Sequence, residues 1–417
     1  MITDRISRFS FVASLLFAIP AASLGQDASK SSTASVDALT KYLQQPVSER
    51  LTIAAQPFAK VPLTKADAAK AKDLLWQDRL AGLREERAAE MKARELTTGK
   101  LKMPFTYQIF GEKPATGRSM YISLHGGGGA PKQVNDSQWE NQKRPYRLEE
   151  GVYVVPRAPT DTWDLWHQSH IDGLFARLIE NFVALEDVDP NRVYLLGYSA
   201  GGDGVYQIAP RMADQLAAAA MMAGHPNETS PLGLRNLPFA IHVGEFDNGY
   251  NRNKVAREWE TKLSDLRKSD AEGYEHKVVL EAGKGHWMDR KDAAAIPWLA
   301  KYRRNPLPTR IVWKQDDVVH NRFYWLAVDP QDVKDRPEVI ASRSGQQIDI
   351  APKGIRRVTV RLKDELVDLD QPVKITSGEK VLFNGPVKRT IGALAKTLAE
   401  RADPQGMFSA EVGVELP

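Results

Sequence analysis

The residues Ser199, Asp247 and His286 have the side-chain types of a nucleophile, an orienting acid and a general base. Ser199 is the centre of a G-x-S-x-G motif at residues 197–201, and the apolar run Val193–Leu196 comes directly before it. In such a motif a strained turn between a strand and a helix projects the hydroxyl group above a sheet, and the small flanking residues let the backbone turn without a clash. This context predicts a nucleophilic serine.

The acid and the base follow two later apolar runs. Phe239–Val243 leads into Asp247, which we choose as the orienting acid, with Glu245 as its rival. Val278–Leu280 leads into a glycine-flanked loop that contains His286. A histidine there would accept the serine proton, and an aspartate would fix its tautomer and stabilise the imidazolium. The chain order serine, aspartate, histidine is typical of one hydrolase fold and differs from that of two other serine protease folds.

A nucleophilic serine also needs N–H groups where negative charge develops on the substrate oxygen. One donor is expected from Ala200, the residue after the nucleophile. The other is expected from Gly126 or Gly127, because the apolar run 120–124 is followed by His125 and four glycines. Glycine lets the backbone approach a substrate closely. The alternatives for this loop are a phosphate-binding loop or a merely flexible one, and we interpret His125 as a structural member of it.

Short apolar runs alternate with amphipathic stretches over residues 104–304, which predicts a mostly parallel sheet covered by helices on both faces. Such a sheet carries its site at the carboxyl ends of its strands. The predicted strands are Phe105–Phe110, Met120–Leu124, Val152–Val155, Val193–Leu196, Ala217–Met222, Phe239–Val243 and Lys277–Leu280, with helices at Ile171–Leu185 and Asn253–Arg267.

The flanking regions have different patterns. Residues 26–103 are predicted to be a leader, mobile over 26–36, followed by a helical segment that includes Ala66–Glu95. Residues 305–417 are predicted to form a small β-rich domain, in which Asn384-Gly385 marks a hairpin turn. The strands expected there are Arg310–Lys314, Arg322–Val328, Ile348–Ile350, Arg356–Leu362, Val373–Thr376 and Val381–Phe383, with one helix at Ile391–Arg401.

The chain resembles the α/β-hydrolase superfamily, in particular the secreted bacterial branch of esterases and polyhydroxybutyrate depolymerase-like proteins often labelled predicted peptidases. The resemblance covers residues 104–304, about half of the chain. It implies carboxylic-ester hydrolysis through a covalent acyl-enzyme and without a cofactor. True depolymerases of this branch often have disulfides and a polymer-binding module, and this chain has no cysteine and no recognisable module of that kind. The motifs that carry the resemblance are His125–Gly129, Gly197–Gly202, Gly244–Asp247 and Gly285–Trp287.

Aromatic residues near these motifs are candidates for lining a substrate site. Trp163 and Trp166 follow a predicted strand and would stack on an aromatic or sugar-bearing ester, or else pack in the core beneath a loop. Tyr198 and Trp287 stand beside the nucleophile and the base. The segment between the predicted strands at 217–222 and 239–243 is too short for a helical lid, so we expect an open site.

His167 and His170, with Asp172 close by, have a spacing that a metal ion could use on a helix. We interpret this cluster as the polar beginning of a helix and predict no metal site. A His/Asp metal hydrolase remains an alternative that sensitivity to a chelator would reveal.

The N-terminus has the pattern of a secretory signal peptide over residues 1–25. Arg5 and Arg8 precede a mostly apolar stretch, Phe9–Ala22, and small residues follow at a cleavage site near Gly25. An uncleaved membrane anchor is the alternative. We expect a secreted or periplasmic protein with no stable membrane insertion after cleavage. The absence of cysteine excludes disulfides and thiolate chemistry, and fits a bacterial periplasm.

The net charge of +4, from 57 basic and 53 acidic residues, argues against a nucleic-acid partner. The leading hypothesis is a secreted serine carboxylesterase acting on a small-molecule or oligomeric ester. A serine peptidase of the same fold, and a non-catalytic protein that binds glycan or cell wall on a hydrolase scaffold, are the alternatives. The β-rich domain would bind a glycan or cover the hydrolase domain, and we favour the structural role.

Overall fold

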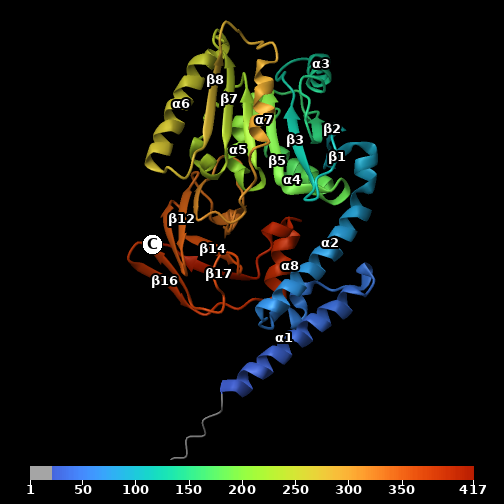
Figure 1. Ribbon diagram of the computed structural model, residues 1–417, viewed down its shortest axis with the longest axis vertical. Coiled ribbons are helices and arrows are strands. Elements are labelled where there is room, and N and C mark those ends of the chain that lie inside the picture. Colours follow the sequence, from blue (N-terminus) through green and yellow to red (C-terminus); the bar gives the residue numbers. More distant parts are fainter. Residues whose placement is uncertain (1–20) are drawn as a thin grey trace, which may run out of the picture.

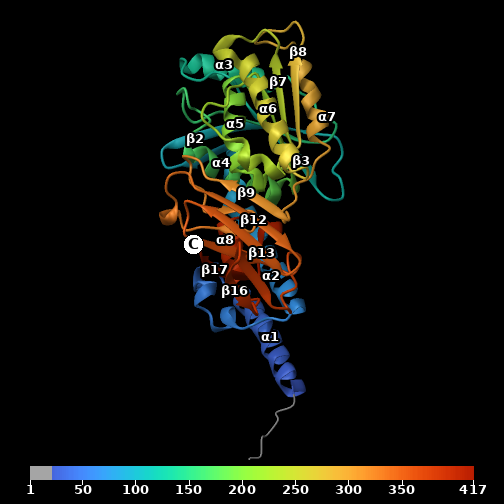
Figure 2. The same ribbon diagram turned by 90° about the vertical axis from the view of Figure 1, so that its left-hand side faces the viewer.

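The computed structural model describes residues 21–417, and these form an upper α/β part, a lower β-rich part and a helical segment that runs beside both (Figures 1 and 2). Most of the predicted signal peptide lies outside the described residues. No helix within residues 21–417 is long and apolar enough to cross a membrane.

The α/β part is organised around one sheet with the strand order β1-β2-β4-β3-β5-β6-β7-β8. From β3 to β8 every pair is parallel, whereas β1–β2 and β2–β4 are antiparallel. All seven predicted strands are confirmed, and only the short polar edge strand β1 was not predicted. The strands are β1 Glu95–Thr98, β2 Leu101–Phe110, β3 Arg118–Leu124, β4 Gly151–Pro156, β5 Val188–Tyr198, β6 Ala218–Met222, β7 Phe239–Gly244 and β8 His276–Glu281.

Both faces of this sheet are buried, as predicted. Along β5, Leu195 packs in one apolar cluster, while its neighbours Tyr194 and Leu196 pack in a second one on the opposite face. Buried strands covered on two sides read as continuous apolar runs, which is why sequence periodicity alone located them. The covering helices are α3 Lys132–Gln142, α4 Ser169–Leu185, α5 Ala200–Arg211, α6 Arg252–Ser269 and α7 Ala295–Leu299 (Figure 1).

The prediction of a mobile leader over residues 26–36 is wrong, because this stretch belongs to helix α1, Ala21–Leu43. Ser32 is fully buried, and its hydroxyl donates to Asp67 at 2.6 Å and accepts the N–H of Thr64 at 2.9 Å. These bonds hold α1 against the first turn of helix α2, Lys65–Ala93. Helix α2 in turn contacts α4 and helix α8, Ile391–Glu400. The serine-rich stretch is therefore helical, and Ser32 holds α1 against α2.

The β-rich part contains two further sheets, with orders β10-β11-β14-β17 and β16-β15-β13-β12-β9. The hairpin turn predicted at Asn384-Gly385 is wrong, because both residues lie in β16 and pair with β15. The turn occurs instead at Gly378, whose φ of +56° suits a residue without a Cβ. The strands are β9 Arg310–Lys314, β10 Arg322–Phe323, β11 Leu326–Ala327, β12 Glu338–Ser344, β13 Gln347–Lys353, β14 Arg357–Leu362, β15 Val373–Ser377, β16 Lys380–Gly385 and β17 Ala410–Glu415.

Buried ion pairs join the two parts. Arg304 contacts Asp403 at 2.8 Å, and both side chains are almost completely buried. Arg401 contacts Asp214 at 2.7 Å across the same boundary. The neighbouring Arg304 and Arg401 guanidinium groups outweigh the effect of burial and lower the pKa of Asp403 to about 2.

This pair predicts a pH-dependent contribution to stability. A carboxyl group whose pKa is lowered on folding stabilises the fold above its ordinary pKa, and that contribution is lost as the pH falls through the folded value. Asp403→Asn should therefore lower the melting temperature at pH 6. Its deficit relative to the wild type should shrink as the pH falls from about 4 toward 2. Calorimetry of both proteins, with the exposed Asp37→Asn as a control, measures this. A deficit that stays constant with pH would contradict it.

Candidate active site

Ser199 occupies a strained turn between β5 and α5, with φ 57° and ψ −121°. The glycines on either side permit this turn. A Cβ on Gly197 would lie 2.3 Å from the carbonyl oxygen of Gly201, and one on Gly201 would lie 2.2 Å from that of Leu124. Such distances are far below van der Waals contact, so the motif needs glycine at both positions. Strain of this kind typically costs about 1–3 kcal/mol and clusters at functional sites.

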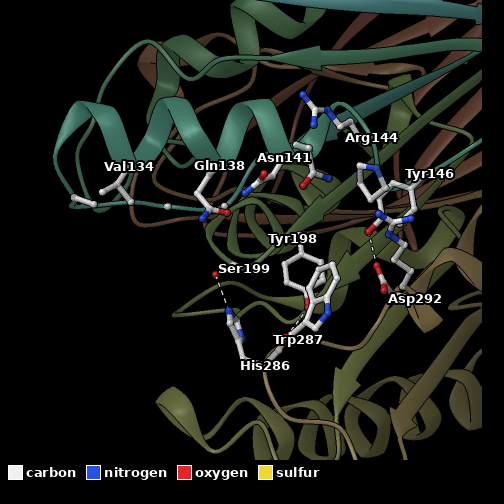
Figure 3. Close-up of a pocket in the computed structure, with 16 residues that line it drawn as sticks. Val134, Gln138, Asn141, Arg144, Tyr146, Tyr198, Ser199, His286, Trp287 and Asp292 are labelled. Atoms are coloured by element: carbon white, nitrogen blue, oxygen red, sulfur yellow. Dashed lines mark hydrogen bonds between the residues drawn. The ribbon is translucent and has the colours of Figure 1, made fainter.

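The structure brings Ser199, His286 and Asp247 into one chain of hydrogen bonds. The Nε2 atom of His286 lies 3.0 Å from the Ser199 hydroxyl (Figure 3). Its Nδ1 atom lies 2.8 Å from an oxygen of Asp247. Asp247 is only 2% exposed, and its other carboxylate oxygen lies 3.6 Å from the guanidinium of Arg252. A buried carboxylate in this position can hold the imidazole in one tautomer while Nε2 faces the serine.

The rival acid, Glu245, has a different partner. Its carboxylate accepts the N–H of Gly283 at 2.9 Å, so it braces the loop that carries His286 rather than the imidazole. Tyr198 braces the same loop from the other side. Its hydroxyl donates to the carbonyl oxygen of His286 and accepts the N–H of Met288 at 3.3 Å. The loop is thereby fixed to the strand that carries the nucleophile.

The predicted oxyanion donors also lie beside Ser199. A Cβ on Gly126 would lie 3.2 Å from the Cβ of Ser199, and Gly127 has a φ of +116° that favours glycine. Ala200 is the first residue of α5, so its N–H has no acceptor within the helix. Gly126 and Gly127 therefore line the pocket together with Ser199, and Ala200 follows the nucleophile directly.

Sequence reasoning missed the residue that shapes this glycine loop. Asn135, fully buried at the start of α3, accepts the N–H of Gly128 and donates to the carbonyl oxygens of Gly128 and Ala130. Its amide oxygen would be 2.0 Å from a Cβ on Gly127. An asparagine in a polar helix has no distinctive sequence pattern. The contact between this amide and the glycine loop is therefore visible only in the tertiary structure.

His125 has the structural role predicted for it. It is fully buried, its Nδ1 donates to the carbonyl oxygen of Gly126 at 2.6 Å, and its Nε2 accepts the N–H of Ala158 at 3.1 Å. Burial lowers its pKa to about 4, so the ring is neutral at physiological pH and suits one donor and one acceptor bond. The imidazole holds the loop that follows β3.

Several solved hydrolase structures are similar to about half of this chain. Similar solved structures include a thermostable esterase, at 16% identity and a TM-score of 0.41, where the match covers 50% of this chain and 62% of that one. A ferulic acid esterase matches at 15% identity and a TM-score of 0.33, covering 50% and 96%. The siderophore hydrolase EstA from Aspergillus nidulans matches at 11% identity and a TM-score of 0.36, covering 50% and 93%. No protein-family model and no curated protein matches the chain.

A pocket of about 770 Å³ opens beside Ser199 (Figure 3). Tyr198 and Trp287 line it, in agreement with the sequence analysis, but Trp163 and Trp166 do not. Trp166 is fully buried and donates its ring N–H to the carbonyl oxygen of His125, so it does not line the substrate site and has the alternative role, packing in the core beneath a loop. Trp163 is exposed and packs against Tyr250. Sequence spacing placed both tryptophans near the site but could not tell which way each side chain points.

The wall of this pocket contains both polar and aromatic side chains. The full set of lining residues is Gly126, Gly127, Ala130, Val134, Gln138, Asn141, Gln142, Arg144, Pro145, Tyr146, Tyr198, Ser199, His286, Trp287, Arg290 and Asp292. They come from the glycine loop, α3 and the segment after it, the nucleophile turn and the loop after β8. The segment between β6 and β7 contributes none of them.

The cluster considered for a metal ion has other partners. The Asp172 carboxylate contacts Arg211 at 2.6 Å and the Nε2 atom of His320 at 2.7 Å, which links α4 to α5 and to the β-rich part. The carbonyl oxygen of His167 accepts from the same arginine. Within residues 21–417, no group of three or more acidic or histidine side chains is arranged to hold a metal ion.

The choice between the two acids can be tested by exchanging each for its amide. Asp247→Asn should slow labelling of Ser199 by a fluorophosphonate probe by about 10⁴-fold, the loss of turnover that the wrong histidine tautomer causes in other triads. Glu245→Gln keeps a side-chain oxygen that can accept the N–H of Gly283 and loses only the negative charge, so it should label within about tenfold of the wild-type rate. Labelling rates that are reversed between the two variants would identify Glu245 as the orienting acid.

The role of Asn135 predicts an effect on reactivity without direct contact with Ser199. Asn135→Ala frees the glycine loop and should slow fluorophosphonate labelling by about 100-fold, the cost typical of displacing a catalytic group by about 1 Å. The exposed Gln133→Ala on the same helix serves as the control and should label at the wild-type rate. Equal rates for all three proteins, measured on folded samples, would show that the loop holds its shape without this amide.

Proposed function

We propose that the protein is a serine hydrolase that cleaves carboxylic esters through an acyl-enzyme intermediate. The observation that carries the proposal is the continuous chain of hydrogen bonds from the Ser199 hydroxyl through His286 to buried Asp247, at the edge of a pocket. Neutral histidine beside a serine is the arrangement that general-base activation requires. A pocket of about 770 Å³ is within the usual size range for small-molecule sites.

In the first half of the proposed reaction, the Ser199 oxygen attacks the ester carbonyl carbon while its proton passes to Nε2 of His286. Negative charge develops on the carbonyl oxygen and is stabilised by the N–H groups of Ala200 and of Gly126 or Gly127. The tetrahedral intermediate then collapses, the C–O bond to the alcohol breaks, and the alcohol leaves with the proton from His286. Asp247 stabilises the imidazolium during both steps.

In the second half, a water molecule gives a proton to the same nitrogen of His286 and attacks the acyl-enzyme carbonyl. The second tetrahedral intermediate releases the carboxylic acid, and the proton returns to the Ser199 oxygen. All of these steps use side chains and backbone groups of the chain itself, so the proposal includes no cofactor. An ester is the substrate we favour because its alcohol leaves more readily than a peptide amine.

The site of action is a second part of the proposal. We infer secretion or a periplasmic location from the N-terminal sequence pattern, in which two arginines precede an apolar stretch and small residues. A small-molecule or oligomeric ester outside the cytoplasm is the corresponding substrate class. Comparing the N-terminal residue and mass of the protein in a periplasmic fraction with those of the full chain tests this point.

Ser199→Ala tests the proposed nucleophile. The wild type should be labelled by a fluorophosphonate probe and should hydrolyse 4-nitrophenyl acetate, and the variant should lose labelling and at least about 10⁴-fold in turnover. Ser199 lines the pocket and is not part of the apolar core, so the variant should keep the wild-type melting temperature. This measurement serves as the folding control. An unlabelled, folded wild type would favour the non-catalytic binding protein, and cleavage of peptide amides in preference to esters would favour a peptidase.

A further inference from the structure

Two arginines in the pocket have no acidic partner among the described residues. Arg144 follows α3, and Arg290 lies in the loop after His286; both are exposed and line the pocket. Two neighbouring lysines outside the lining are paired, Lys143 with Glu140 and Lys284 with Asp289 at 2.5 Å each. The pocket therefore has two guanidinium groups whose donors face no carboxylate of residues 21–417.

The one acidic side chain of the lining, Asp292, does not neutralise them. Asp292 is 2% exposed and its carboxyl group accepts a hydrogen bond from the buried hydroxyl of Tyr146, and among the described residues it forms no ion pair with either arginine. Burial also raises the pKa of this carboxyl group. Among the lining side chains Arg144 and Arg290 are the two cations and Asp292 is the one acid, so the formal charge of the lining is positive.

Arg144, one of the two unpaired arginines, lies at the end of the pocket away from the nucleophile. In Figure 3, Ser199 and Gln138 lie at one side, whereas Arg144 lies at the other side with Tyr146 and Asp292. Tyr198 and Trp287 stand between these two groups in the same view. A substrate with its ester carbonyl at Ser199 would extend past the aromatic rings toward the cations.

We propose that the pocket selects esters that carry a second, free carboxylate group, which Arg144 and Arg290 bind while the ester carbonyl lies at Ser199. This inference rests on the proposed function and adds a substrate class to it. Arginine suits the task because its planar N–H donors match the two oxygens of a carboxylate. The aromatic and amide walls between the two ends accommodate an uncharged spacer.

Matched ester pairs test the selection. On the acyl side, 4-nitrophenyl hydrogen glutarate is compared with its neutral methyl ester, and on the alcohol side 4-acetoxybenzoate is compared with methyl 4-acetoxybenzoate. In the acyl-side pair both esters release 4-nitrophenol, so the ratio of kcat/KM, anionic over neutral, compares the acyl groups alone. In the alcohol-side pair the two leaving groups differ, so its ratio is compared between the wild type and each variant. We expect a ratio above 1 for at least one pair in the wild type, declining as salt is added because exposed charges are screened.

The double variant Arg144→Gln/Arg290→Gln should lower that ratio by about tenfold or more, through a higher KM for the anionic ester. Arg147→Gln is the matched control, because Arg147 is exposed, has no ion pair among the described residues and does not line the pocket. It should keep the wild-type ratio. Labelling by a neutral fluorophosphonate reports whether the triad is intact in each variant.

The outcomes separate this inference from the proposed function. A wild type that is labelled and hydrolyses the neutral esters, but shows no anionic preference in either pair, overturns the carboxylate selection and leaves the hydrolase proposal standing. A preference that survives in the double variant, or that Arg147→Gln abolishes equally, also overturns it, because the general surface charge would then be responsible. A folded wild type that is neither labelled nor active on any ester overturns both.

Discussion

The close approach of three backbone segments at Gly197 and Gly201 is the constraint on which the site depends. The end of β5, the start of α5 and the end of β3 are so near one another that no Cβ fits at either glycine. This contact forces the left-handed conformation of Ser199 and points its hydroxyl away from the sheet. It also places the glycine loop that follows β3 directly beside the nucleophile, so a single packing restriction positions both the reacting group and the expected oxyanion donors.

The rest of the site is held by side chains that brace loops. Tyr198 and Glu245 attach the loop of His286 to the strand ends of β5 and β7, and Asn135 attaches the glycine loop to α3. A buried carboxylate with its own cation, Asp247 beside Arg252, then orients the imidazole. Hydrogen-bond donors and charged groups that are held in place before the reaction can stabilise the charge that develops in a transition state.

The β-rich part contacts the α/β part away from the pocket. Every lining residue of the pocket lies within residues 126–292. The joining contacts are buried ion pairs such as Arg304 with Asp403, together with Asp172 beside His320. A buried pair is costly to break by removing one member, since the other charge is left without compensation. These contacts fit the structural role favoured from the sequence.

The sequence by itself determined the elements and the chain order of the chemical groups. Buried parallel strands are local apolar runs, and the turn at Ser199 needs glycines at fixed spacing, so both are written in short stretches of residues. Tertiary structure decided what depends on distant partners. Asn384-Gly385 became strand because β15 lies beside it, and Trp166 turned inward to reach the carbonyl oxygen of His125. The positions of three further residues depend on how α3 and the loop after β8 pack near Ser199. These residues are Asn135, Arg144 and Arg290. No local pattern encodes such contacts, because they join segments that are far apart in the chain.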